Sequence, residues 1–280
     1  MNNAHVYDIA VAYRIYPGIS KQPVIFGDDK WKLSELCLRS FRDSLGTLRA
    51  KIFVILDNCP SEYKALFTKY FAEKDIVFIE QNGIGNARTF ALQIMLLLEQ
   101  NDSEYIYFAE DDYFYLPNQF SAAIGFMKEC KTEFITLYDH LDSYTLDIHN
   151  HTEKIAVSHG KHWRTTGSTC LTFLTTKTAL RATKRVFATY SKKNYDASIW
   201  FALTKRNVLN PLKILASINS MQMVKLYGKA WLFCSTTILF GKKRTLWNPI
   251  PAGCTHIENG GLAPNIDWQS EFQKSQENLS

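Results

Sequence analysis

Apolar residues along the first half of the chain follow two alternating patterns. Continuous apolar runs of strand length stand at residues 9–16, 51–56, 75–80, 105–109 and 134–138. Between them, apolar residues recur three or four positions apart, as on one face of a helix, at residues 31–45, 61–71, 86–99 and after Pro117. Strands separated by helix-length segments are typical of a parallel sheet covered on both faces. We therefore expect an α/β fold with a Rossmann-like, mostly parallel central sheet flanked by helices.

Two of the expected helices carry local predictions. Ser61 fits the N-cap of the helix that follows Pro60. The next helix would bury one apolar stripe, made by Ala87, Ala91, Ile94, Met95 and Leu98.

The second half of the chain is less regular. Two strands within residues 154–176 would flank a loop at 159–167, and helices are expected at 177–189 and 196–205. Residues 207–239 show no pattern that assigns them. Prolines and glycines make residues 249–264 irregular. We expect this half to form a smaller C-terminal part of the same domain.

The composition indicates one folded domain. The chain has 280 residues, of which 46% are hydrophobic, enough for a substantial core. Only the polar residues 270–280 lack a core pattern, and we expect residues 271–280 to form a flexible tail. The start of the chain does not read as a signal peptide, and no apolar run approaches the roughly 18 residues of a spanning helix. Six cysteines without paired spacing indicate reduced thiols and a cytoplasmic protein.

Basic residues concentrate in one segment. Between Arg181 and Thr245 there are thirteen Lys or Arg residues and one acid, Asp196, so the segment carries +12 and leaves −7 for the rest of the +5 chain. Such a segment is either a solvated face or a surface for anionic lipid, which would hold the protein reversibly on the inner face of a membrane. Nucleic acid is not expected as a partner because no binding module for it is recognisable. The aromatic residues within or just beyond the segment include Trp200, Phe201, Trp231, Phe233 and Trp247.

Polar side chains gather where the expected strands end, the edge at which parallel sheets bind ligands. Three adjacent carboxylates, Glu110, Asp111 and Asp112, follow the fourth strand. They repel one another, so a positive charge is expected beside them. Alternation along an extended chain would put Glu110 and Asp112 on one side and Asp111 on the other. Carboxylate oxygens suit Mg²⁺ or Mn²⁺; the alternative is an acidic turn that faces solvent.

Other strand-end groups each have two interpretations. Asp57 would accept a hydrogen bond from a ribose or a base, or else form an Asx turn before Pro60. Arg14, inside an apolar strand, requires an anion beside it, either a nucleotide or an acidic side chain. The loop at residues 82–85 would bring backbone N–H groups and a helix N-terminus towards a phosphate, with Arg88 adding a charge, or else simply connect a strand to a helix.

In this order and spacing, these features resemble the nucleotide-binding region of family 2-type glycosyltransferases with the GT-A fold. The resemblance covers about residues 8–140, and residues 110–112 are similar to the DXD motif of that family. It implies that Asp57 contacts the base or ribose, and that Glu110 or Asp111 lies near the ribose or donor sugar. It also implies that Asp112 binds the metal. Glu110 stands where the first Asp of the family motif usually stands, and Asn58 follows Asp57 where a second Asp is common, which leaves base specificity open.

The resulting assignment divides the chain at residue 140. Residues 1–140 form the nucleotide-sugar-binding half, and residues 141–270 form the acceptor-binding and catalytic half. The expected donor-binding residues are Arg14, Asp57, Asn82, Arg88, Glu110 and Asp111. The expected ligands of Mn²⁺ or Mg²⁺ are Asp112, Glu110 and His256.

The resemblance also extends to roles in the second half. Many inverting members place a catalytic acid at a helix start in this region, so Asp196 is the expected base, with an N-cap as the alternative. Similar folds often bring a late histidine back to the metal, so His256 is expected there, unless it is an ordinary loop histidine. Trp163 and Arg164 fall where acceptor-side residues lie, and the Trp163 ring would either stack on a sugar or belong to the core.

The expected activity is metal-dependent, inverting transfer of a sugar from a nucleotide-diphosphate sugar to a hydroxyl group of a glycan or lipid-linked acceptor. Two other classes stay open. One is a non-catalytic, membrane-surface binding protein on a degenerate transferase scaffold. The other is a nucleotidyltransferase, which would normally have a glycine-rich, basic loop after the first strand; residues 16–21 are a faint version of one.

Overall fold

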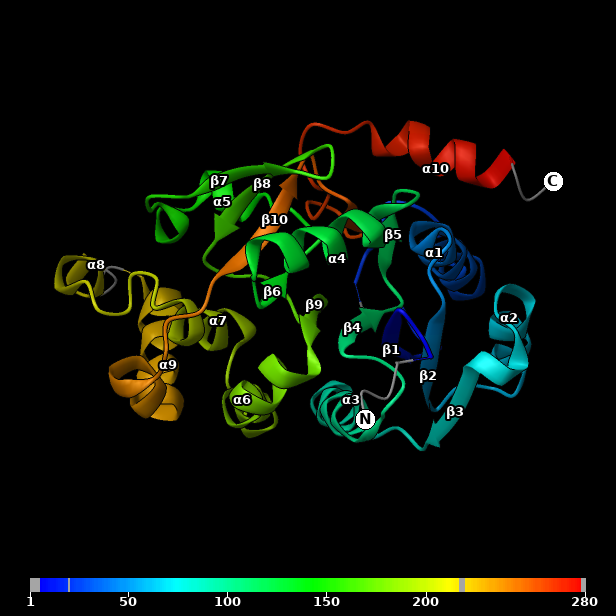
Figure 1. Cartoon of the computed structure of the whole chain (residues 1–280), viewed down its shortest axis with the longest axis horizontal. Coiled ribbons are helices and arrows are strands. Elements are labelled where there is room, and N and C mark those ends of the chain that lie inside the picture. The colour runs from blue at the N-terminus through cyan, green and yellow to red at the C-terminus, as the bar shows by residue number, and fades with distance from the viewer. Residues whose placement is uncertain (1–5, 20, 217–219, 278–280) are drawn as a thin grey trace.

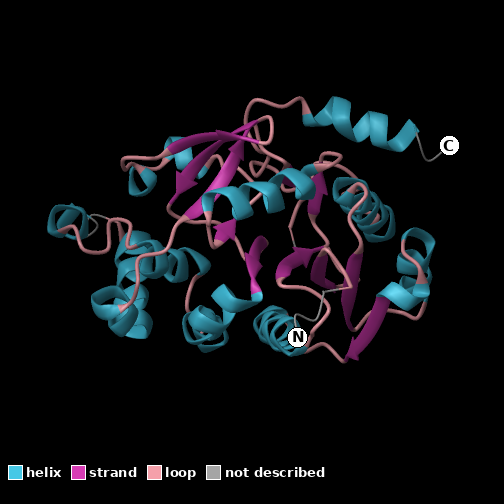
Figure 2. Ribbon diagram, viewed as in Figure 1, coloured by secondary structure: helices cyan, strands magenta, loops and turns pink. Residues whose placement is uncertain are grey.

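The computed structural model of the chain describes residues 6–19, 21–216 and 220–277. A nine-stranded sheet, in the order β3-β2-β1-β4-β9-β6-β10-β8-β7, runs through this part of the chain (Figures 1 and 2). Seven of these strands run in one direction, and β9 and β8 run against them. The strands are β1 (Ile9–Ile15), β2 (Ala50–Asp57), β3 (Ile76–Gln81), β4 (Tyr105–Glu110), β6 (Phe134–Ile135), β7 (Ile155–Ser158), β8 (Lys161–Thr166), β9 (Phe173–Thr176) and β10 (Leu246–Ile250). The mostly parallel α/β class expected from the sequence is confirmed.

Helices cover both faces of the sheet and create two hydrophobic cores. One core holds side chains of α1 (Lys30–Leu45), α2 (Glu62–Tyr70), α4 (Gln119–Cys130) and α10 (Trp268–Glu277). The other holds side chains of α3 (Asn86–Glu99), α6 (Lys177–Phe187), α7 (Asp196–Thr204) and α9 (Met221–Phe240). Successive residues of β1 alternate between the cores, with Val11 and Tyr13 in the first and Ala10 and Ala12 in the second. One sheet therefore joins the two halves of the chain.

The remaining elements are short. A second, two-stranded sheet pairs β5 (Tyr113–Tyr115) with β11 (Cys254–His256), which brings the end of the chain back to residues just after β4. The short helices are α5 (Asp142–Thr145) and α8 (Pro211–Ala216), with single 3₁₀ turns at Glu73–Asp75, Asp147–His149 and Ala188–Lys192. Among the described residues, no helix has the length and hydropathy needed to cross a membrane.

The stripe predicted for α3 is wrong, although the helix has the expected bounds. Met95 is 44% exposed, and the buried residues are Thr89, Phe90, Gln93, Ile94 and Leu97. Gln93 belongs to the buried face because its amide donates hydrogen bonds to the carbonyl oxygens of Ala12 (2.7 Å) and Ala109 (3.1 Å). A pattern that counts only apolar residues therefore rotates the helix away from its true buried face.

Two further local expectations are corrected. Ser61 occupies the N-cap position of α2, but it accepts no capping hydrogen bond, and its hydroxyl donates to the carboxylate of Glu62. The expected loop at 159–167 is mostly strand β8, and the turn consists of His159 and Gly160, both with positive φ. Two such residues suit a tight hairpin turn. The apolar pattern does not indicate β8 because most of its side chains are polar. They can lie inside the fold because they have hydrogen-bonding partners there.

The tail expected at residues 271–280 is wrong for the residues that the structure describes. Residues up to Glu277 belong to α10, and residues 278–280 lie outside the described part. Phe272 is fully buried, with its ring centroid 5.0 Å from that of Phe114 in an edge-to-face contact. Phe272 thus packs residues 271–277 against the domain, although the other residues of this segment are mostly polar.

The basic segment, residues 181–245, does not present its tryptophans as expected. Trp200 is fully buried against Phe134, Phe173 and Phe187, and Trp247 is also buried. The residues left unassigned at 207–239 contain α8 and most of α9, apart from residues 217–219, which are outside the described part. Exposed apolar side chains of this segment belong mainly to those two helices.

We predict that Phe272→Ala lowers the free energy of unfolding by about 3 kcal/mol, because it empties a packed aromatic site. Chemical denaturation of the full chain measures the change. Gln273→Ala, at the exposed neighbouring position, is the control and should stay within about 0.5 kcal/mol of the parent. Equal stability of both variants would show that α10 does not pack on the domain.

Candidate active site

The three carboxylates at residues 110–112 each contact a different basic side chain. The strand ends at Glu110, and Asp111 and Asp112 lie in a turn before β5, so the strict alternation expected of an extended chain does not apply. The expected positive charge is present for each carboxylate. It is supplied by side chains from β1, α1 and β11, which the fold brings to the end of β4.

Glu110 pairs with Arg14, the charged residue inside β1. The guanidinium donates to the Glu110 carboxylate, and also to the backbone carbonyl of Asn86 at 2.9 Å. The second Glu110 oxygen accepts a hydrogen bond from the Thr172 hydroxyl at 2.6 Å. Both oxygens of Glu110 are engaged by protein groups, and one of these is the Arg14 guanidinium, a cation that would repel a metal ion, which argues against the expected role of Glu110 as a metal ligand.

Asp111 pairs with Lys30 at the start of α1. Their charged atoms are 2.6 Å apart, and the backbone N–H of Tyr16 donates to the same carboxylate at 3.3 Å. Burial raises the pKa of Asp111 above its ordinary value, against the opposing effect of Lys30. Lys30 was not among the residues selected from the sequence, because nothing in its neighbourhood distinguishes it from a helix-surface lysine.

Asp112 meets His256, which the pairing of β11 with β5 returns to the site. His256 Nε2 lies 3.0 Å from Asp112 Oδ2. Burial by itself would raise the pKa of Asp112, but the contact with His256 holds it below the ordinary value. Burial by itself would lower the pKa of His256, but the contact with Asp112 raises it above the ordinary value. The other Asp112 oxygen, Oδ1, is buried without a hydrogen-bond partner. His256 also contacts Glu258, at 3.3 Å.

This orphaned oxygen bears on the expected metal. A buried carboxylate oxygen without a partner is costly, and a neighbouring imidazole nitrogen adds a second donor atom. Within the described part of the chain, no group of three or more His, Cys, Asp or Glu side chains is arranged to hold a metal. Mg²⁺ and Mn²⁺ sites commonly use one or two protein ligands and take the rest from water and substrate phosphates. Asp112 and His256 fit that pattern.

Asp57 holds the loop that follows β3. Its two carboxylate oxygens accept hydrogen bonds from the backbone N–H groups of Ile84 (2.8 Å) and Gly85 (2.9 Å). Gly83 and Gly85 have φ values of +66° and +79°, which side-chain-bearing residues rarely adopt. Asp57 does not form the expected Asx turn before Pro60, and a hydrogen bond from a ribose or a base would be additional to these two contacts. It uses two of the N–H groups that were expected to face a phosphate.

A cavity of about 480 Å³ lies at these strand ends. Arg14, Asp57, Gly85 and the three carboxylates contribute to its wall. Asn82 and Arg88, also expected at the donor site, are exposed and do not line this cavity. The cavity is polar on one side and backed by the ends of β1, β2 and β4, so it is the candidate donor cavity.

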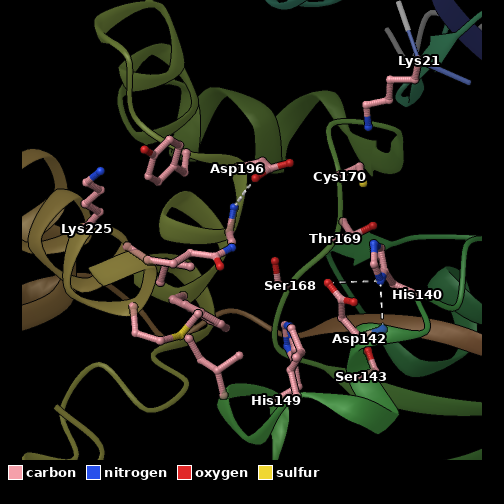
Figure 3. Close-up of a pocket in the computed structure, with 18 residues that line it drawn as sticks. Lys21, His140, Asp142, Ser143, His149, Ser168, Thr169, Cys170, Asp196 and Lys225 are labelled. Carbon is pink, nitrogen blue, oxygen red and sulfur yellow. Dashed lines mark hydrogen bonds and ion pairs between the residues drawn. The ribbon is translucent and has the colours of Figure 1, made fainter. Parts of the chain in front are cut away.

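A second cavity, of about 540 Å³, contains Asp196 and is the candidate acceptor cavity (Figure 3). Asp196 and Lys225 come from helices on one side, and His140 and Asp142 lie on the opposite side. Asp196 is half-buried in the first turn of α7, where its carboxylate accepts a hydrogen bond from the N–H of Ala197 at 2.7 Å. Tyr195, not Asp196, occupies the N-cap position, so the capping alternative is not supported.

Unlike Glu110, Asp111 and Asp112, Asp196 has no countercharge. Among the described residues, no Lys, Arg or His lies within ion-pair distance of it. Burial raises its pKa above the ordinary value, while the Ala197 N–H and the more distant Lys21 act in the opposite direction. A carboxylate that is desolvated and uncompensated is a stronger base than an ordinary aspartate.

Lys21 links the two cavities. A small cavity of about 50 Å³ shares Tyr16, Asp111 and Asp112 with the donor cavity, and Lys21 with the acceptor cavity. The ammonium of Lys21 lies 2.7 Å from a carboxylate oxygen of Glu258. Beyond the faint basic loop at residues 16–21, no sequence signal marks this position. The small cavity therefore lies between the other two and has wall residues in common with each.

The acceptor roles expected for Trp163 and Arg164 are wrong. Trp163 is fully buried, stacked on Phe126 with ring centroids 4.4 Å apart, so no sugar can reach its face. Arg164 is buried and ion-paired with Asp139 at 2.6 Å and Glu153 at 3.1 Å. Both residues belong to the interior of the sheet, as their place in β8 requires.

Comparison with protein-family models finds no match, and a search of curated proteins finds none either. Among solved structures, the chain is similar to S. aureus TarS in complex with UDP-GlcNAc, at 12% identity over 64% of this chain and 48% of that chain, with a TM-score of 0.44. It thus spans about half the length of that structure. A putative nucleotide-diphospho-sugar transferase from Desulfovibrio desulfuricans matches at 11% identity over 82% of this chain and 97% of that chain, with a TM-score of 0.44.

A 4-diphosphocytidyl-2C-methyl-D-erythritol synthase from Anaerococcus prevotii matches at 10% identity over 98% of this chain and 96% of that chain, with a TM-score of 0.45. With TM-scores below 0.5, these similarities carry no conclusion about the reaction.

We predict that Arg14→Met destabilises the fold by about 3 kcal/mol, because it leaves the Glu110 charge without its buried partner. Adding Glu110→Gln to this variant should restore more than half of the loss. The control is Lys64→Met, which breaks the exposed Lys64–Glu80 pair and should cost less than about 1 kcal/mol. Denaturant unfolding measures all three; no recovery in the double variant would contradict the pairing.

Proposed function

We propose that this protein is a glycosyltransferase that moves a sugar from a nucleotide-diphosphate sugar to a hydroxyl acceptor. One observation carries the proposal: Asp196, a carboxylate with a raised pKa and no countercharge, lines a cavity that shares Lys21 with the small cavity beside the acidic cluster. A base in one cavity and anion-binding, metal-suited groups in the next match what transfer to a hydroxyl requires.

In this proposal the donor occupies the cavity at the ends of β1, β2 and β4. Arg14 and Glu110 bound it on one side, and the loop held by Asp57 bounds it on another. Asp57 retains lone pairs beyond its two loop contacts, so a ribose hydroxyl can still donate to it. The rigidity of this loop favours Asp57 as a positioning residue for the nucleoside.

Asp112 and His256 would hold a divalent cation, Mn²⁺ or Mg²⁺. Such a cation, when bound, neutralises negative charge on the diphosphate leaving group. Asp112 supplies the orphaned oxygen, and His256 must be neutral to act as a ligand. The lysines nearby, Lys21 and Lys30, are each paired with a carboxylate and keep those carboxylates in place.

Asp196 then takes the proton from the acceptor hydroxyl as that oxygen attacks the anomeric carbon. Attack from the side opposite the leaving nucleoside diphosphate inverts the configuration at that carbon. The hydrogen bond from Ala197 holds the carboxylate in the first turn of α7 and leaves its other oxygen for the acceptor.

Two alternatives are tested against this one. A nucleotidyltransferase needs basic groups for a triphosphate, but Lys21 and Lys30 are already ion-paired. A non-catalytic scaffold would have no use for a half-buried carboxylate without a countercharge, which costs stability. The decisive experiment screens nucleotide sugars by thermal shift with Mn²⁺ and then follows product formation. Release of a nucleoside diphosphate supports glycosyl transfer; release of pyrophosphate from a nucleoside triphosphate, or no turnover with a bound donor, overturns it.

We predict that Asp196→Asn lowers kcat by roughly 10²–10⁴ and leaves the Kd of the donor unchanged. In the parent enzyme the rate should fall as pH drops through the pKa of Asp196, which lies above the ordinary aspartate value of about 3.9. The variant should lack this acid limb. Steady-state kinetics across pH, with donor binding measured separately, provide the test; a variant with normal kcat and weak donor binding would exclude the base role.

The stability of Asp196→Asn distinguishes a catalytic base from a helix N-cap. Because the folded state raises the pKa of Asp196, it binds this proton more tightly than the unfolded state does, and the ionised carboxylate lowers stability at neutral pH. Asp196→Asn should therefore keep or raise the melting temperature. A loss of about 1 kcal/mol would instead indicate a cap.

We predict that Asp112→Asn weakens Mn²⁺ binding at least about tenfold and abolishes transfer while the fold stays intact. Glu110→Gln is the matched comparison, since it removes a charge from the same cluster. It should change Mn²⁺ affinity by less than about threefold, because both Glu110 oxygens bind protein groups. Calorimetric titration of Mn²⁺ in the presence of a nucleoside diphosphate measures both. Unchanged affinity in Asp112→Asn would refute the metal site.

A further inference from the structure

Helix α9 exposes an apolar face. Its buried side faces the second core through Leu226, Tyr227, Ala230, Cys234 and Ile238. The opposite side carries Met221, Val224, Leu232 and Leu239, which are 69%, 41%, 74% and 53% exposed. Met221, Val224 and Leu232 are spaced by three and eight residues, which places them on one stripe of the helix. Leu239 follows a kink at Cys234 and extends the exposed apolar surface beyond it. The outer side of a surface helix normally carries charged and polar residues instead.

Helix α8 extends this apolar surface. Leu212 and Leu215 stand one helical turn apart and are 75% and 65% exposed. Both helices lie at the same end of the long axis of the molecule (Figure 1). We call the exposed stripe of α9 together with these two leucines the α8–α9 face. Exposed apolar patches rimmed by polar groups are typical of interaction sites.

In the segment that carries the α8–α9 face, every charged side chain is positive. Residues 197–257 contain eight Lys or Arg residues and no Asp or Glu. Lys213 lies on α8, and Lys225 and Lys229 lie on α9 beside the apolar stripe. A second copy of the chain would bring the same positive charge to the interface, which disfavours self-association through this face.

We propose that the α8–α9 face binds an anionic lipid bilayer. Leucines and a methionine that project between lysines enter the acyl boundary while the ammonium groups meet lipid phosphates. Binding of this kind is peripheral and reversible, because no described helix can span the bilayer. It differs from the expectation based on aromatic residues, since Trp200 and Trp247 are buried and the apolar contacts come from aliphatic side chains.

The same helix borders the acceptor cavity. Gln222, Met223 and Lys225 of α9 contribute to its wall together with Asp196 of α7. Docking through α9 therefore places this cavity at the lipid surface. This step alone rests on the proposed function: if Asp196 is the base, the acceptor is a lipid-linked glycan.

The test is co-sedimentation of the full chain with vesicles of phosphatidylcholine, alone or with about 30% phosphatidylglycerol. We expect binding to the anionic vesicles at about 0.05 M salt, reduced roughly fivefold or more at about 0.5 M salt, and little binding to the neutral vesicles. No binding to anionic vesicles at low salt overturns the proposal. Salt-independent binding to both kinds of vesicle overturns its electrostatic part.

Matched variants locate the surface. Leu212→Ser with Leu232→Ser should lower vesicle binding roughly tenfold, whereas Ile155→Ser, at a β7 position 73% exposed, should not. Lys213→Gln with Lys229→Gln should lower low-salt binding, whereas Lys154→Gln should not. Equal binding by the leucine variant and its control overturns the assignment, as does a dimer in light scattering that this variant abolishes. Donor binding by thermal shift should be the same in all variants, so failure here is distinct from failure of the proposed function.

Discussion

Three adjacent like charges at the end of β4 set the constraint around which the site is built. Residues 110–112 repel one another, and burial makes an unpaired carboxylate costly. Each is matched by a separate basic side chain, Arg14, Lys30 or His256, from β1, α1 and β11. These contacts tie the first strand, the first helix and a strand near the end of the chain around one point. The pairing of β11 with β5 is what makes the third contact possible.

In this arrangement most carboxylates of the site are engaged by protein groups, whereas Asp196 remains available to accept a proton. Glu110 and Asp57 have both oxygens occupied by protein donors, and Asp111 is paired with Lys30. Asp196 has one backbone hydrogen bond and no cation, and its pKa is raised. Removing water and withholding a countercharge both favour the protonated form. Proton uptake is therefore the reaction to which Asp196 is suited.

The sequence predicts the alternating strands and helices of the first half because apolar periodicity directly reflects which faces are buried. It also indicates the residues at the strand ends, since parallel strands end at one edge. The sequence does not predict the residues that pair with them. Lys30 and Lys21 look like surface lysines, and Arg164 looks like a ligand-binding arginine until Asp139 and Glu153 are placed beside it. Partners distant in sequence are set by tertiary packing, which local patterns do not encode. The same holds for α10, which is held by contacts across the fold, those of Phe272 with Phe114 and of Ser275 with Arg39.

The charge balance of the donor side gives a physical reason for a metal. In many nucleotide sites backbone N–H groups after a strand cradle the phosphates, but here Asp57 takes those of Ile84 and Gly85. Side chains must then supply the positive charge. Among the described residues, the charged groups that line the donor cavity and the small cavity beside it are five carboxylates, Asp57, Glu110, Asp111, Asp112 and Glu258, against Arg14, Lys21, Lys30 and, when protonated, His256. The protein alone therefore presents a net negative wall to a diphosphate, which is itself anionic. A further cation would offset this repulsion, and the unpartnered oxygen of Asp112 is where such a cation would gain most.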